Sequence, residues 1–174
     1  KWREENAADL PHWLESLSEW DGLLSLATLH FNFPSYAFAE VNAQHALESR
    51  DVGHLLIPDT IRGTNNFDLG KPAKIWLITG ANMAGKSTFL RSLGVNFVLG
   101  SIGSPVCASQ WRMPLVALRS GMRTSDSLQD HQSYFFAELH RLQSIMQELR
   151  AGKPMFILLD EILKGTNSTD KQLG

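Results

Sequence analysis

A glycine-rich run at residues 80–88 constrains this chain more than any other part of its sequence. It follows a short apolar stretch at residues 74–79 and reads Gly80, Ala81, Asn82, Met83, Ala84, Gly85, Lys86, Ser87 and Thr88. Glycines at this spacing allow successive backbone N–H groups to turn inward and approach a polyphosphate more closely than a Cβ atom would permit. The sequence therefore predicts a nucleotide-phosphate cradle between a strand and a helix.

Both flanks of the run support this interpretation. The apolar stretch at residues 74–79 is typical of a strand that is buried on both faces. After Lys86, apolar residues recur at helical spacing as far as Gly100, and they are Phe89, Leu90, Leu93 and Phe97. In such a cradle Lys86 meets the β- and γ-phosphates, and the Ser87 hydroxyl holds Mg²⁺ at the helix N-terminus. A glycine-rich turn without a ligand is the alternative, and the two flanks count against it.

A second apolar run, at residues 155–159, ends in the adjacent acids Asp160 and Glu161. Gly152 and Pro154 precede this run and mark a turn, so it predicts a buried parallel strand. Such a strand delivers carboxylates to the C-terminal edge of a sheet, where α/β folds bind ligands. Asp160 is then placed to support Mg²⁺, and Glu161 to polarise an attacking water. Two acids at a strand end can also be structural, and the glycine-rich run favours the catalytic interpretation.

Apolar spacing predicts two further helices. The first begins near Leu10 and ends at residues 32–34, with a stripe made of Trp13, Leu17, Trp20, Leu24 and Ala27. We expect Trp13 and Trp20 to be packing residues rather than ligand contacts. The second runs from about Ser133 to Gly152, with an apolar face made of Phe135, Leu139, Leu142, Met146 and Leu149. Ser133 at its start is either a helix cap or a phosphate contact, and one geometry serves both.

Three segments, residues 79–88, 160–162 and 165–169, together resemble the ATPase domain of MutS-type DNA mismatch repair proteins, of the ABC-ATPase class. The resemblance implies an α/β P-loop NTPase fold of the ABC-ATPase type, with a largely parallel sheet flanked by helices and an N-terminal helical segment. It also implies two domains. Residues 1–34 are expected to end a helical core or lever domain, and residues 35–174 to form a P-loop ATPase domain, truncated after its Gly-Thr-x-Ser-Thr loop.

The resemblance assigns roles residue by residue. Residues 80–88 match the Walker A loop that binds ATP, and Asp160 with Glu161 matches Walker B and the catalytic acid. Ser133 matches the signature serine that contacts, in trans, the γ-phosphate of ATP bound to the partner subunit. Residues 165–170 match a loop that crosses the dimer interface. Asn65 matches an asparagine on the adenine side of the site.

The chain departs from the family pattern at two places. His131 and Gln132 stand where the signature has Gly-Arg before its serine. Arg62 stands near the place of the aromatic residue that stacks on adenine, and an arginine can also stack on a base. Gln110 is a candidate for the loop that senses Mg²⁺ and the γ-phosphate.

Composition sets outer limits on these expectations. At 174 residues and 43% hydrophobic, the chain can bury one core with a helical appendage. A net charge of −2 gives it no electrostatic reason to grip DNA by itself. Its single cysteine, Cys107, excludes an internal disulfide. The sequence shows neither a signal peptide nor an uninterrupted apolar span, so we expect a cytoplasmic protein with no membrane contact.

We therefore expect ATP binding and hydrolysis that drive conformational change in a DNA repair protein, with ATP and Mg²⁺ as cofactors. The resemblance implies a homodimer in the full-length protein, DNA bound mainly outside this chain, and a downstream repair protein as a further partner. The isolated chain is expected to be weakly active or inactive. Two alternatives stay open: a P-loop phosphotransferase, which needs an acceptor pocket and a lid, and a nucleotide-binding switch or scaffold with negligible turnover.

Overall fold

A computed structural model gives the fold of the protein and describes residues 1–43, 46–70, 75–81, 83–122 and 131–162. The elements in chain order are α1 (Trp2–Asn6), α2 (Leu10–Asn32), β1 (Ala37–Phe38), β2 (Glu40–Val41), β3 (Glu48–Val52), β4 (Asn65–Asp68), α3 (Lys86–Ser101), β5 (Pro105–Val106), β6 (Gln110–Met113), β7 (Ala117–Gly121), α4 (His131–Arg150) and β8 (Met155–Leu159). The three helices predicted from apolar spacing are confirmed as α2, α3 and α4. The boundary between the two expected domains stays a prediction.

The described strands form mixed sheets that are mostly antiparallel. In the four-stranded sheet, of order β2-β6-β3-β4, β3 runs antiparallel to both of its neighbours and β2 runs parallel to β6. Strands β1 and β5 pair antiparallel, and β7 and β8 pair parallel. The prediction of a largely parallel sheet of the ABC-ATPase type is therefore wrong. Parallel neighbours need a long crossover, usually a helix, and of the two parallel pairs only β7–β8 has the simple form of strand, one helix (α4) and strand.

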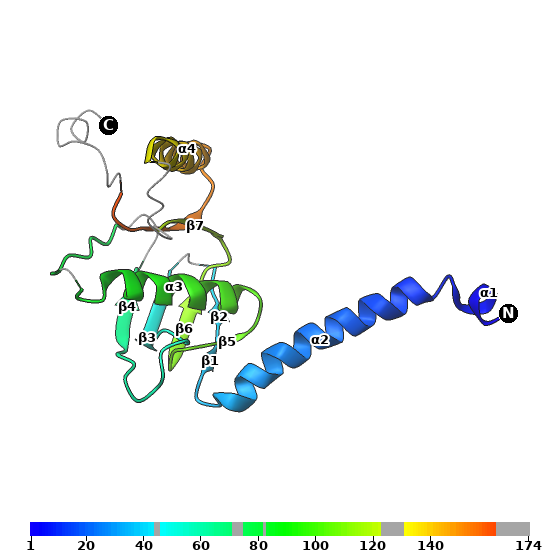
Figure 1. Cartoon of the computed structure of the whole chain (residues 1–174). Helices are drawn as coiled ribbons and strands as arrows, with labels where there is room; N and C mark the ends of the chain where they lie inside the picture. Colours follow the sequence, from blue (N-terminus) through cyan, green and yellow to red (C-terminus); the bar gives the residue numbers. More distant parts are fainter. Residues whose placement is uncertain (44–45, 71–74, 82, 123–130, 163–174) are drawn as a thin grey trace.

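Helix α3 lies between the four-stranded sheet and the β7–β8 pair, as Figure 1 shows. Its apolar face contributes Leu93 and Phe97 to the core, where they join Trp111 of β6 and Phe156 of β8. The helix also approaches β6 closely near its C-terminal end. A Cβ atom at Gly100 would lie 2.7 Å from the sulfur of Met113, so the absence of a side chain there allows the contact.

The segment before the glycine-rich run is not a strand in the structure. Residues 75–79 have no regular secondary structure, and the side chains of Ile75 and Leu77 are 95% and 86% exposed. The prediction of a strand buried on both faces at residues 74–79 is therefore wrong for the described part, since Lys74 lies outside it. A strand needs a neighbour to complete its hydrogen-bond ladder, and β8 pairs with β7 instead.

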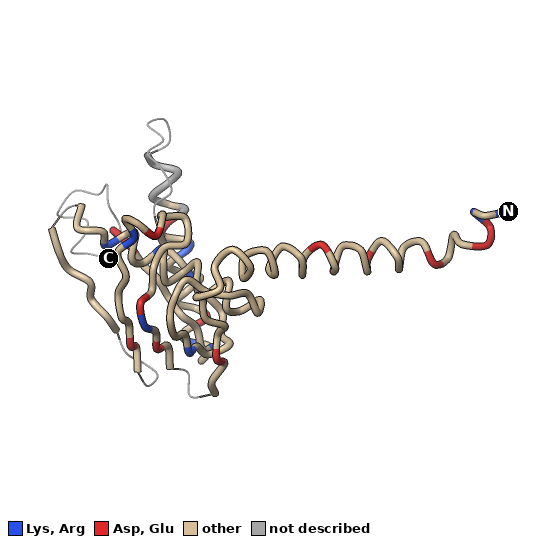
Figure 2. Tube along the Cα trace, turned by 90° about the horizontal axis from the view of Figure 1, so that it is seen from below, with Lys and Arg blue, Asp and Glu red and all other residues tan. Residues whose placement is uncertain are grey.

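Helix α2 projects away from the rest of the molecule and meets it along its C-terminal part (Figure 1). None of its residues is buried, and Trp13 and Trp20 are both exposed, contrary to the packing predicted for them. Its charged residues are all acidic, as Figure 2 shows along its length. None of the helices in the described part of the chain is long and apolar enough to cross a membrane.

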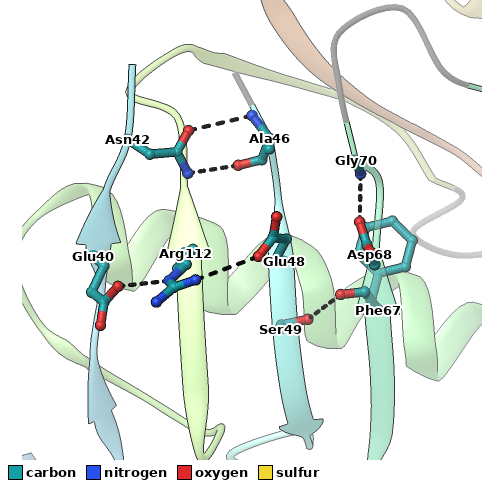
Figure 3. A network of polar contacts seen from close by, with 9 residues as sticks. All are labelled: Glu40, Asn42, Ala46, Glu48, Ser49, Phe67, Asp68, Gly70 and Arg112. Carbon is teal, nitrogen blue, oxygen red and sulfur yellow. Dashed lines mark hydrogen bonds and ion pairs between the residues drawn. The ribbon is translucent and has the colours of Figure 1, made fainter. Parts of the chain in front are cut away.

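The outward face of the four-stranded sheet is polar. Arg112 of β6 donates a 2.7 Å hydrogen bond from Nε to Glu40 of β2, and its Nη1 lies 3.8 Å from a carboxylate oxygen of Glu48 in β3 (Figure 3). All three side chains are substantially exposed. Exposed ion pairs of this kind add little to the stability of the fold, so we interpret this face as a solvated surface.

Candidate functional site

The glycine-rich loop closes onto the first residue of α3 through the Lys86 ammonium group. The Nζ atom of Lys86 donates hydrogen bonds to the carbonyl oxygens of Gly80 and Ala81, both at 2.7 Å. These bonds hold the side chain over the loop from which the helix starts. Asn82, in the middle of the loop, lies outside the described residues. The arrangement positions a cation at a helix N-terminus, where backbone N–H groups lack intrahelical partners.

The backbone of the loop takes two left-handed turns. Gly85 is the N-cap of α3 with φ 84°, and Met83 has φ 64° although it carries a side chain. Ala81, Met83 and Ala84 are exposed, as is Gly85. Ser87, in the first turn of α3, is partly buried, and Thr88 beside it is exposed. A non-glycine residue in this conformation is uncommon and marks a local turn or strain, which is often found at ligand sites.

The paired acids follow β8 directly. Asp160 donates its backbone N–H to the carbonyl of Gly121 at 2.9 Å, so the β7–β8 ladder continues one residue beyond the strand. Glu161 then turns into the left-handed region, with φ 49°. This turn ends the extended backbone that begins with β8. The prediction of a parallel strand that ends in Asp160 and Glu161 is confirmed.

The packing of α3 against β8 brings the acids toward the loop. The rings of Phe97 and Phe156 lie 5.0 Å apart, and a Cβ atom at Gly94 would lie 3.1 Å from Leu158. The later residue of β8, Leu158, therefore lies against the residue of α3 that is nearer to the N-terminus of that helix. Because Asp160 comes next along β8, the acids leave the strand on the side where α3 begins.

The remaining predicted site residues lie elsewhere. Asn65 is the exposed first residue of β4, and Gln110 begins β6, where it pairs with Arg50 of β3. Ser133 lies in the first turn of α4, together with His131 and Gln132. The predicted interface loop, residues 165–170, lies outside the described part of the chain. The role of Ser133 therefore stays a prediction.

Arg62 does not have the exposure that stacking on a base requires. Its side chain is 6% exposed, forms an ion pair with Asp59, and donates hydrogen bonds to Tyr36 and Cys107. Burial acts to lower the pKa of Arg62, but the hydrogen bonds and charge interactions with Tyr36 and Cys107 together outweigh that effect, so the pKa is raised above its usual value. The hypothesis that Arg62 stacks on adenine is therefore wrong.

One buried residue of α3 was missed by the reasoning from sequence. Asn96 is fully buried and binds three backbone groups, at Gly53, Ser92 and Cys107. A signal for it was present, because Asn96 is an amide next to Phe97 in an otherwise apolar stretch of helix. Buried amides are costly unless hydrogen-bonded, so such a residue marks a specific polar network.

Comparisons with known proteins assign the family. The family model described as MutS domain V matches residues 76–172. The protein named DNA mismatch repair protein MutS from Dinoroseobacter shibae is 34% identical over 172 residues, which cover 94% of this chain and 19% of that relative. Its namesake from Thermosipho melanesiensis is 30% identical over 166 residues, covering 90% of this chain and 19% of the relative. A protein of the same name from Desulfovibrio desulfuricans is 40% identical over 107 residues, which cover 61% of this chain and 11% of that relative.

This chain thus spans about a fifth or less of the length of the relatives it matches. The matched region includes both the loop that Lys86 closes and the acids that follow β8. Since the family model covers more than half of its residues, the chain belongs to the MutS family of DNA mismatch repair proteins and carries sequence of its domain V.

Proposed function

We propose that this chain binds Mg·ATP at residues 80–88 and, within a longer protein, hydrolyses it to drive conformational change in DNA mismatch repair. One observation carries the proposal. The Lys86 ammonium is held at the N-terminal end of α3 by the carbonyls of Gly80 and Ala81. A lysine held this way can exchange carbonyl oxygens for phosphate oxygens without leaving the loop.

Each residue of the proposed site has a chemical task. The backbone N–H groups of the loop and of the first turn of α3 bind phosphate oxygens, and Lys86 neutralises the β- and γ-phosphates. The Ser87 hydroxyl and Asp160 hold Mg²⁺, which when bound neutralises charge on the phosphates. Glu161 accepts a proton from, and orients, the attacking water. Asn65 contacts the adenine side.

The longer protein supplies the rest of the machinery in this proposal. It forms a homodimer in which Ser133 reaches the γ-phosphate on the partner subunit, and it works with a downstream repair protein in the cytoplasm. DNA is bound mainly through regions other than this chain. The net charge of −2 and the acidic character of α2 support that division, because DNA binding needs clustered basic residues.

The first test compares two lysine variants. Lys86→Ala removes the phosphate contact, whereas Lys153→Ala removes an exposed lysine between α4 and β8 and serves as the matched control. In a titration with a fluorescent ATP analogue and Mg²⁺, Lys86→Ala should weaken binding by about 10–100-fold, the effect of losing one hydrogen bond to a charged group. Lys153→Ala should bind like the parent. Parental affinity in Lys86→Ala, with an unchanged thermal unfolding curve, would refute the site.

The second test separates hydrolysis from binding. Glu161→Gln keeps the side-chain volume and removes the carboxylate, so the full-length protein should still bind Mg·ATP while phosphate release falls by about 10²–10⁴-fold. Phosphate release at the parental rate would exclude Glu161 as the base. A parent that binds ATP without releasing phosphate is instead a switch or scaffold. Transfer of the phosphate to a second substrate would identify a phosphotransferase.

A subunit-mixing experiment tests Ser133. In full-length protein, Lys86→Ala and Ser133→Ala each disable both sites of a dimer, whereas a mixed dimer has one site with both defects and one with neither. Random exchange should therefore restore about a quarter of the parental turnover. Mixing Lys86→Ala with Glu161→Gln is the control and should restore none, because both residues serve the same subunit's site. A first mixture that never exceeds the average of its parents would contradict action in trans.

A further inference from the structure

A buried arginine stands where α2 joins the rest of the molecule. The Nη1 atom of Arg62 donates to the hydroxyl of Tyr36 at 2.5 Å and to the thiol sulfur of Cys107 at 2.8 Å. Its guanidinium also pairs with Asp59, and its carbon lies 5.7 Å from the centre of the Tyr36 ring. Tyr36 and Cys107 are themselves buried. Arginine is almost never this buried unless it is paired, so the cluster is a specific structure rather than a surface contact.

On one side the cluster is tied to the last turn of α2. The backbone N–H of Tyr36 donates to the carbonyl of Phe33 at 3.0 Å, and the two aromatic rings stack with centroids 4.8 Å apart. Phe33 is the C-cap of α2 and donates its own N–H to Leu29 in the helix. Because α2 buries no residue, its direction depends on the few contacts near its C-terminal end, and this attachment is one of them (Figure 1).

On the other side the cluster is tied to α3. The Asn96 side chain accepts from the backbone N–H of Cys107 at 2.7 Å and donates to the carbonyl of Gly53 at 3.0 Å. Gly53 in turn donates its N–H to the carbonyl of Cys107 at 2.9 Å. A Cβ atom at Gly53 would lie 2.4 Å from Cδ of Arg62, so the glycine leaves the room that the arginine fills.

We propose that Arg62 is a positioning residue that sets the direction of α2 and couples it, through Cys107 and Asn96, to α3. The planar guanidinium serves this purpose because it binds several acceptors in one rigid geometry, which a flexible ammonium does not. Helix α3 begins at Lys86, a residue of the proposed nucleotide site. A regulatory role for the coupling therefore rests on the proposed function. A change at the phosphate loop that shifts α3 then reaches α2 through one continuous set of buried contacts.

The test measures the direction of α2 with two spin labels. Cysteines replace Ser16 on α2 and Arg50 on β3, both exposed, while the buried Cys107 stays unlabelled. The parent should give one narrow distance distribution between the labels, and Mg²⁺ with a non-hydrolysable ATP analogue should shift it. Arg62→Ala should broaden the distribution even without nucleotide and abolish the shift. Calorimetry of the same samples should show analogue affinity within about threefold of the parent, a free-energy change well below that of losing a phosphate contact.

Three further variants sharpen the test. Arg112→Ala, which removes an arginine from ion pairs on the exposed sheet face (Figure 3), is the matched control and should leave the distribution narrow. Tyr36→Phe removes only the acceptor hydroxyl and should give intermediate broadening, which keeps the proposal testable if Arg62→Ala fails to fold. Arg62→Lys should give a distribution narrower than that of Arg62→Ala but broader than that of the parent, because an ammonium keeps the positive charge and lacks the planar set of donors of a guanidinium.

The outcomes distinguish this proposal from the nucleotide site. A narrow, parental distribution in folded Arg62→Ala, or in Tyr36→Phe where Arg62→Ala does not fold, overturns the role of Arg62 in directing α2. A broad distribution whose mean still shifts with the nucleotide analogue as in the parent overturns the coupling. If the parent shows no binding of Mg²⁺ and analogue by calorimetry, the coupling falls with the proposed function. Broadening in nucleotide-free Arg62→Ala would still support the junction.

Discussion

Residues 75–79 and strand β8 have the same kind of sequence, a short apolar run that leads into a polar turn, but the structure treats them differently. Every residue of β8 has a partner in β7, and its Phe156 and Leu158 are buried. Residues 75–79 form no strand, and Ile75 and Leu77 face solvent. Apolar composition makes a strand possible, but only a neighbouring strand that completes its hydrogen bonds makes it form.

Amide hydrogen exchange should show the largest difference between the two segments. The amides of β8 that bond to β7 should exchange about 10³-fold or more slowly relative to unfolded chain, because core strands open only with most of the molecule. The amides of residues 75–79 should exchange at rates near those of unfolded chain. Equal protection in the two segments, measured by mass spectrometry of peptides, would show that residues 75–79 are paired in solution and would remove the contrast.

Truncation of the buried ring in β8 should have the next largest effect. Phe156→Ala removes a side chain that packs on Phe97 of α3, and it should lower the free energy of unfolding by about 3–5 kcal/mol. Chemical denaturation followed by circular dichroism measures the change. A loss below about 1 kcal/mol would mean that the contact between β8 and α3 contributes little, since fully buried rings otherwise cost several times that amount.

A smaller effect is expected where β7 ends. A Cβ atom at Gly121 would lie 2.9 Å from Cδ2 of Leu159, so Gly121→Ala forces that flexible side chain to move. We expect a destabilisation of about 1 kcal/mol, the lower end of the range for overpacking. The same denaturation experiment measures it. A stabilised variant would show that Leu159 relaxes freely and that the end of β8 is looser than the structure indicates.

The smallest effect is expected at residues 75–79. Leu77→Ala removes an exposed side chain, so the free energy of unfolding should change by no more than about 0.5 kcal/mol. This variant is the direct counterpart of Phe156→Ala. A loss above about 2 kcal/mol, the size expected for a core leucine, would place Leu77 in a core and would make the two apolar runs equivalent.

Several elements of the fold could be predicted from local pattern. The spacing of Leu90, Leu93 and Phe97 predicted α3, and the breakers before Met155 predicted the start of β8. These predictions succeeded because helix periodicity and turn residues act over a few neighbouring positions. The positions of the acids followed for the same reason, since Asp160 and Glu161 come directly after the strand.

The errors concern features that depend on distant residues. The largely parallel sheet was wrong because the direction of pairing between β3, β4 and β6 is set by connections and packing across the chain. The stacking hypothesis for Arg62 was wrong because its partners, Tyr36 and Cys107, lie 26 and 45 residues away in sequence. The contacts predicted for Asn65 and Ser133 also depend on distant groups, and they stay predictions.

The sequence by itself determined helices α2, α3 and α4, the loop that begins α3, the acids that follow β8, and the MutS family to which the chain belongs. Tertiary structure alone decided which strands pair, which apolar run is buried, and which residues the Arg62 guanidinium contacts. The physical reason is the distance along the chain over which each interaction acts. Helical periodicity and glycine conformation act within about one or two turns of chain, whereas burial and strand pairing depend on surfaces that meet only when the chain has folded.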